Sequence, residues 1–257
     1  MQAKQVLRFM VISLILHLPF AAFANTTTLA VASNFKSTAQ QLKMVFEQQY
    51  PYQVRIVSAS SGKLYAQILQ QAPFDIFLSA DQQKTGLLIE QGLVQNNQAF
   101  TYAIGRLVLW SANNALDVKT CLLQHCYSRL AMANPHYAPY GLAAQETLKA
   151  LSLTVQPQDI VMGENINQTL QFIQTGNVEL GFIAASQLSL IGAANTSSIN
   201  IWPIPDAHHS AIKQDAVSLK RSKDNPAAKA FWQFLQQQTA QAIITSAGYQ
   251  TLPGTAQ

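Results

Sequence analysis

Small hydroxyl and amide residues follow two short apolar runs of this chain, and each pair is followed by a helical pattern. The first run ends in Ser33-Asn34 and the second ends in Ser60-Ser61. A helix N-terminus leaves backbone N–H groups without partners inside the helix, and its dipole favours negative charge. Serine hydroxyls and asparagine amides add further donors. The pattern therefore indicates an anion-binding site.

Two more junctions of this kind occur in the second half of the chain, at Pro139-Tyr140-Gly141 and between Glu164 and Asn167. At any single junction, Ser and Asn are most simply helix caps. Four junctions together, with glycine where close backbone approach is needed, indicate a ligand site instead.

The candidate groups are mainly hydrogen-bond donors: Ser33, Asn34, Ser61, Tyr140 and Ile166. A protonated anion such as hydrogen phosphate needs an acceptor for its proton, usually a carboxylate, and this set contains none. Glu164 is near Ile166, but an acid at a helix start commonly complements the dipole. The set favours a fully deprotonated tetrahedral anion, and sulfate, molybdate and tungstate all remain open at this point.

Two short motifs suggest an enzyme. Ser60-x-x-Lys63 and Lys84-Thr85-Gly86 match elements of penicillin-binding enzymes. They lie only about twenty residues apart, no S-x-N element separates them, and the second opens a helical pattern rather than a strand. A serine hydrolase is therefore a remote alternative, and we expect no catalytic residues.

The cysteines and histidines offer weak candidates for a metal site. Cys121 and Cys126 are the only cysteines, in an expected loop, and a local disulfide is the simplest interpretation in an oxidising compartment. A thiolate metal site that includes His125 would lack a second ligand pair. His208-His209 would point apart on a strand. We expect no cation site and no cofactor.

The N-terminus is typical of a secretory signal peptide. Lys4 and Arg8 precede an apolar run, and Ala22-Phe23-Ala24 matches a cleavage site after Ala24. The run is short for a membrane anchor, and no cysteine is present for lipid attachment. We expect export to the periplasm. Cleavage lowers the net charge from +4 to about +2, and no basic cluster suggests nucleic-acid binding.

Strand and helix patterns alternate along the mature chain. Expected strands cover residues 29–32, 54–57, 74–78, 102–110, 129–133, 160–162, 178–183 and 216–219, and expected helices 35–46, 62–71, 84–91, 142–151, 167–175 and 226–236. Such alternation predicts an α/β fold with doubly wound, mostly parallel sheets and helices on both faces.

The chain restarts near residues 103–106 and returns through prolines near 203–206, which predicts two lobes joined by two crossings. Lobe 1 would be residues 25–104 with 206–257, and lobe 2 would be the inserted residues 105–205. Ligands of open α/β sheets bind outside the carboxyl ends of the strands, so the four junctions should meet in a cleft between the lobes.

Longer motifs resemble the molybdate-binding periplasmic proteins of ABC transporters. They comprise ASNF at 32–35, SSGKLYAQI at 60–68, APFDIFLSAD at 72–81, YAIGRLVLW at 102–110, APYG at 138–141 and GYQTLP at 248–253. The resemblance covers essentially the whole mature chain.

The resemblance implies a two-lobed type II periplasmic binding fold that closes like a hinge on molybdate or tungstate and delivers it to a membrane permease. By motif position, the same five residues would hold the anion. One branch of the family uses a tyrosine after a late strand, and the segment Leu180–Ser186 contains none. The region of Tyr140 would fill that place, through its hydroxyl, its N–H or both. We expect a monomer.

Overall fold

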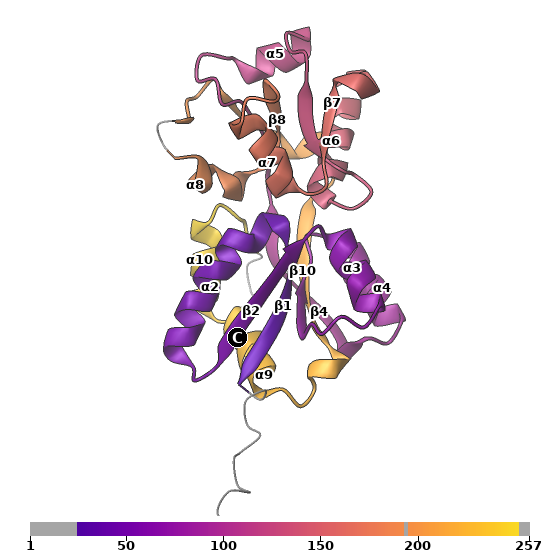
Figure 1. Ribbon diagram of the computed structural model, residues 1–257, viewed down its shortest axis with the longest axis vertical. Coiled ribbons are helices and arrows are strands. Elements are labelled where there is room, and N and C mark those ends of the chain that lie inside the picture. Colours follow the sequence, from indigo (N-terminus) through magenta and orange to yellow (C-terminus); the bar gives the residue numbers. More distant parts are fainter. Residues whose placement is uncertain (1–24, 193–194, 252–257) are drawn as a thin grey trace, which may run out of the picture.

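The computed structural model describes residues 25–192 and 195–251. Two five-stranded sheets covered by helices form two lobes, which lie end to end along the long axis of the molecule (Figure 1). No helix within these ranges is both long and apolar enough to cross a membrane. The expected signal peptide, residues 1–24, lies outside the described residues.

The sheet of the first lobe has the strand order β2-β1-β3-β10-β4. Its strands are β1 (Thr26–Ala32), β2 (Gln53–Ala59), β3 (Ile76–Leu78), β4 (Val94–Gly105) and β10 (Ile212–Leu219). β1 is parallel to β2 and β3, whereas β10 is antiparallel to both β3 and β4. Four strands therefore run in one direction and β10 runs against them.

Helices cover both faces of this sheet because its interior strand β1 is apolar on both sides. Leu29 and Val31 of β1 pack with α2 (Lys36–Gln49), α9 (Pro226–Leu235) and α10 (Gln238–Ser246). The intervening residue, Ala30, packs on the other face with α3 (Ser61–Leu69) and α4 (Gln83–Glu90). Alternate residues of a strand point to opposite faces, so a continuous apolar run fills two cores.

The second lobe repeats this plan with the strand order β7-β6-β8-β5-β9. Its strands are β5 (Leu107–Trp110), β6 (Leu130–Ala133), β7 (Ile160–Gly163), β8 (Leu180–Ala184) and β9 (Ile201–Pro203). β6 is parallel to β7 and β8, and β5 is antiparallel to its neighbours. The α/β architecture with mostly parallel sheets agrees with the expectation from sequence.

The helices of the second lobe also divide between two faces. α5 (Val118–Gln124) and α6 (Pro139–Ala150) share a core with one face of β6, and α7 (Ile166–Gln174) and α8 (Leu188–Ile191) share one with the other. Short 3₁₀ turns complete the described elements: η1 (Ser33–Phe35), η2 (Pro157–Asp159), η3 (Ala185–Gln187), η5 (Asp206–His208) and η6 (Lys220–Ser222).

The two sheets exchange strands at two crossings. β4 ends at Gly105 and β5 begins at Leu107, so a single residue separates a strand of one sheet from a strand of the other. The second crossing runs from the end of β9 to the start of β10. In each sheet, the strand that follows a crossing is the one that runs against the others.

The expectation of a loop around the cysteines was wrong. Cys121 lies in α5, whose N-cap Asp117 accepts a hydrogen bond from Thr120 N at 3.0 Å. The helix ends before His125, which adopts left-handed φ of 54°, and Cys126 returns to form a disulfide with Cys121. The short helix was missed because its seven residues carry too little apolar periodicity.

We predict that Phe46→Ala lowers the free energy of unfolding by about 3–5 kcal/mol. Phe46 on α2 is fully buried, and its ring lies 4.7 Å from Tyr50, 5.1 Å from Phe231 and 5.5 Å from Phe234. Urea denaturation followed by circular dichroism measures the change. Met44→Ala on the same helix is the control, because Met44 is 58% exposed and its loss should cost less than about 0.5 kcal/mol. Equal stability of the two variants would contradict this account of the core.

Candidate functional site

The five residues expected to bind an anion line one small cavity of about 10 Å³ between the lobes. Ser33, Asn34 and Ser61 come from the first lobe, and Tyr140 and Ile166 come from the second. The complete lining is Ala32, Ser33, Asn34, Ser60, Ser61, Ala80, Ala138, Pro139, Tyr140 and Ile166. All four strand–helix junctions therefore meet at one place.

Two helix starts of the second lobe present backbone N–H groups to this cavity. Pro139 opens α6 without an N–H of its own, so the first N–H of that helix belongs to Tyr140. At α7, the cap Asn165 accepts hydrogen bonds through its Oδ1 from Asn167 N at 3.0 Å and Gln168 N at 3.2 Å, and leaves the N–H of Ile166 free. Within the described residues, neither Tyr140 N nor Ile166 N has an intramolecular partner.

Two serine hydroxyls of the first lobe are also available. Ser61 Oγ accepts a hydrogen bond from Ala80 N at 2.9 Å, so its proton remains free for donation. Ser60 Oγ is buried and has no partner in the described part of the chain, although Ser60 occupies the N-cap position of α3. A buried hydroxyl without a partner is costly, which points to a partner supplied by a ligand. Ser60 was part of the predicted junction but was not selected as a site residue.

The cavity offers donors without a carboxylate. Tyr140 is the single ionisable residue of its lining. Glu164, considered from sequence, instead forms an ion pair with Lys63, whose Nζ lies 2.7 Å from Glu164 Oε2 with both side chains exposed. The cavity lining therefore combines hydrogen-bond donors with no carboxylate, which is the feature that favours a fully deprotonated anion.

A buried polar network lies beside the cavity and engages two of the predicted side chains. Asn34 Nδ2 donates to Gln214 Oε1 at 2.8 Å and to Tyr249 Oη at 3.1 Å. Gln214 Nε2 donates to Tyr140 Oη at 3.3 Å. The side chains of Asn34 and Tyr140 are thus held by protein groups.

Tyrosine hydroxyls in this network stay protonated. Burial raises the pKa of Tyr102, Tyr140 and Tyr249 above the usual value, because an ionised phenol loses its hydration.

Gln214 and Tyr249, the partners of Asn34 in this network, are 180 and 215 residues away from it in sequence. No local pattern in the sequence could have shown that they meet.

The lobes approach so closely beside the cavity that glycine is required at two positions. Gly62 N donates to Tyr137 O of the other lobe at 3.0 Å, and a Cβ at Gly62 would lie 3.0 Å from Tyr137 Cα. A Cβ at Gly105, in the strand before the first crossing, would overlap the hydroxyl of Tyr140. A side chain at either position would push the lobes or the α6 helix away.

The structure does not support the hydrolase or metal interpretations. Lys63 Nζ bonds Glu164 while Ser60 Oγ has no partner among the described residues, so the two form no serine–lysine pair. Lys84-Thr85-Gly86 lies in α4, as its pattern indicated. Among residues 25–192 and 195–251, no three His, Cys, Asp or Glu residues gather as a metal site would need.

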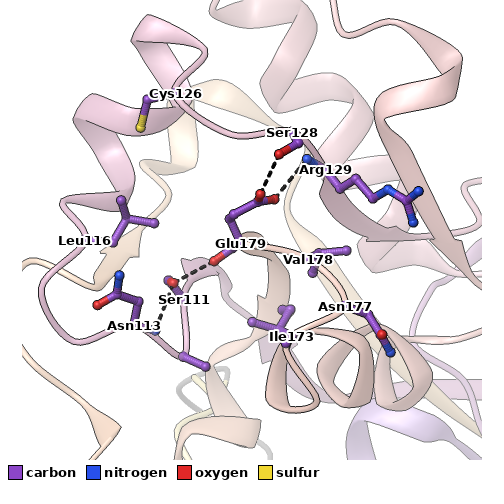
Figure 2. Close-up of a pocket in the computed structure, with 12 residues that line it drawn as sticks. Ser111, Asn113, Leu116, Cys126, Ser128, Arg129, Ile173, Asn177, Val178 and Glu179 are labelled. Atoms are coloured by element: carbon purple, nitrogen blue, oxygen red, sulfur yellow. Dashed lines mark hydrogen bonds between the residues drawn. The ribbon is translucent and has the colours of Figure 1, made fainter.

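A larger groove of about 600 Å³ lies in the second lobe, away from the predicted residues (Figure 2). Its polar groups bond one another: Glu179 accepts from Ser128 Oγ at 2.7 Å and Arg129 N at 2.9 Å, and its backbone carbonyl accepts from Ser111 Oγ at 2.6 Å. Burial raises the pKa of Glu179, but these hydrogen bonds outweigh it and lower the pKa overall. Unlike the small cavity, this groove is lined by full charges, the carboxylate of Glu179 and the guanidinium of Arg129.

Comparisons with known proteins agree with this geometry. The sequence pattern of the bacterial extracellular solute-binding protein family matches residues 27–250. The molybdate-binding protein ModA of Rhodobacter capsulatus is 39% identical over 243 residues, which cover 93% of this chain and 94% of that protein. ModA of Azotobacter vinelandii is 38% identical over 232 residues, covering 89% and 91%.

A solved structure confirms the expected two-lobed periplasmic binding fold. The periplasmic molybdate-binding protein of Azotobacter vinelandii aligns with a TM-score of 0.81 and 36% identity, over 88% of this chain and 99% of that one. The resemblance found in the sequence motifs is thereby confirmed as well. The chain belongs to the bacterial extracellular solute-binding protein family, together with these molybdate-binding proteins.

Proposed function

We propose that this protein captures molybdate, and tungstate with it, in the cavity between its lobes and delivers the anion to an ABC-type membrane permease. The observation that carries the proposal is the cavity lining, in which helix starts from both lobes present hydrogen-bond donors and no carboxylate. The curated relatives at 38–39% identity are molybdate-binding proteins. The bound anion is a ligand, and no cofactor takes part.

The anion would be held by neutral donors. We assign this role to the backbone N–H groups of Asn34, Tyr140 and Ile166 and to the hydroxyls of Ser33, Ser60 and Ser61. Hydrogen bonds to a charged group are worth about 1.5–3 kcal/mol each, and exclusion of water strengthens them further. Discrimination against the smaller sulfate would come from the geometry of the closed cavity.

We further propose export to the periplasm with cleavage after Ala24, and a monomeric, non-enzymatic mature protein. β1 begins at Thr26, two residues beyond that position, so cleavage there would leave the fold intact. Lobe 1 would comprise residues 25–104 and 206–257, and lobe 2 residues 105–205. The two crossings would serve as the hinge.

Calorimetry with the mature protein, residues 25–257, tests the function directly. Molybdate and tungstate should bind tightly with a stoichiometry of one, sulfate weakly, and phosphate undetectably, because its proton would face donors. Heat with sulfate and none with molybdate would replace the proposal by a sulfate-binding function.

We predict that Ser61→Ala and Ser60→Ala each weaken molybdate binding by about 1.5–3 kcal/mol, because each removes one hydrogen bond to a charged ligand. Ser246→Ala is the matched control, since Ser246 is exposed on α10 and, among the described residues, its hydroxyl bonds only Ile243 O. Titration calorimetry measures all three. An affinity unchanged from that of the parent protein would remove the serine concerned from the site.

Molybdate affinity should change less than about twofold between roughly pH 6 and pH 9. Tyr140 is the single titratable residue of the lining, and burial raises its pKa, so the hydroxyl keeps its proton throughout this range. Titrations at several pH values in buffers of equal ionic strength provide the measurement. A tenfold change would show that a histidine or carboxylate takes part in binding.

A further inference from the structure

Asn167, the second residue of α7, reaches from the second lobe to the backbone of the first. Its Nδ2 donates to Ser33 O at 2.9 Å. Its Oδ1 lies 2.9 Å from the Nε2 donor of Gln187. The side-chain amide is therefore held at both ends, by its own lobe and by the opposite one.

Gln187 is itself a fixed support. It is 1% exposed, its Oε1 accepts from Ala184 N at 2.9 Å, and its Nε2 also reaches Ile166 O at 3.2 Å. The side chain of Asn167 is thus hydrogen-bonded to a buried side chain of its own lobe and not to an exposed surface group. This arrangement fixes the direction in which its amide donor points.

The carbonyl that Asn167 contacts belongs to the peptide between Ser33 and Asn34. The N–H of that peptide is the backbone N–H of Asn34, a residue of the cavity lining. A hydrogen bond to a peptide carbonyl polarises the peptide and strengthens its N–H as a donor. Asn167 can therefore act on a bound anion through the peptide without touching the anion.

The same turn of α7 also lines the cavity from the second lobe, since Ile166 directly precedes Asn167. Ser33 and Asn167 stand on different lobes, so their bond can exist only when the lobes are closed. Other side-chain contacts also join the lobes: Gln214 Nε2 donates to Tyr140 Oη at 3.3 Å, and Ser186 Oγ donates to Asn34 O at 3.2 Å. The ion pair of Lys63 with Glu164 is exposed and contributes little.

We propose that Asn167 is a positioning residue that couples lobe closure to retention of the oxyanion, through its hydrogen bond to Ser33 O. This inference rests on the proposed function. The bond forms after the anion has entered and the lobes have closed, so it slows anion release without affecting capture.

The test compares rates of binding and release of radiolabelled molybdate by the mature protein, in rapid filtration with an unlabelled chase. Asn167→Ala should raise the dissociation rate about five- to tenfold and change the association rate less than twofold. Asn167→Asp should raise it more, because a carboxylate oxygen would then face Ser33 O. Affinities for molybdate and tungstate should fall by the same factor.

Asn177→Ala is the matched control, since Asn177 lies just beyond α7 and its amide bonds only Thr175 Oγ1 within the described chain. Asn167→Ser provides a second variant if Asn167→Ala folds poorly, and equal melting temperatures without ligand exclude a merely structural effect. Small-angle scattering of the molybdate-loaded variants should show a larger radius of gyration than the parent protein.

The outcomes separate the two proposals. A parent protein that fails to bind molybdate overturns the proposed function, and the role of Asn167 with it. A parent protein that binds, with Asn167 variants that release molybdate at its rate, overturns only the role of Asn167. A change in association alone would also overturn it.

Discussion

A doubly charged anion that enters a closed cavity loses its hydration, and this protein has no full positive charge in the cavity lining to replace it. The compensation must come from dipoles, that is, from backbone N–H groups at helix starts and from serine hydroxyls. Dipoles act only over short distances and in fixed directions, so every element around the cavity has to be placed accurately. A donor is left free at the start of each of three helices. These donors follow from Pro139 at the start of α6, from Asn165 at the N-cap of α7, and from Ser60 at the N-cap of α3, whose hydroxyl makes no capping bond.

The two sheets place the helix starts accurately because both have the same arrangement of strands. In each, a parallel set of three strands delivers its carboxyl ends to the interface, and the strand that arrives from a crossing lies next to that set. The helices that follow those strands therefore point their N-termini at the same space from two sides. Close approach completes the arrangement, and it depends on the missing side chains of Gly62 and Gly105.

Local chemistry made much of this predictable. A strand followed by Ser, Asn or Pro and then by a helical pattern is encoded within about ten residues, so the junctions at Ser33, Ser61, Tyr140 and Ile166 could be found in the sequence. The structure brings them to one cavity, and their binding of an anion stays a prediction. The partners that occupy the side chains of Asn34 and Tyr140 could not be predicted, because Gln214 and Tyr249 approach only through the tertiary fold. The short helix α5 was not predicted for the opposite reason. It is encoded locally, but its seven residues carry too weak an apolar periodicity.

The position of β10 has a consequence for how the chain is made. β10 lies between β3 and β4 and pairs with both, so no earlier strand joins these two parts of the first sheet. During synthesis from the N-terminus, the second lobe is complete in sequence at β9, whereas the first still lacks the strand that joins β3 to β4. The second lobe can thus fold before the sheet of the first lobe is complete. Gln214 lies in β10 itself and Tyr249 follows α10, so the polar network beside the ligand cavity is complete in sequence only near the end of the chain.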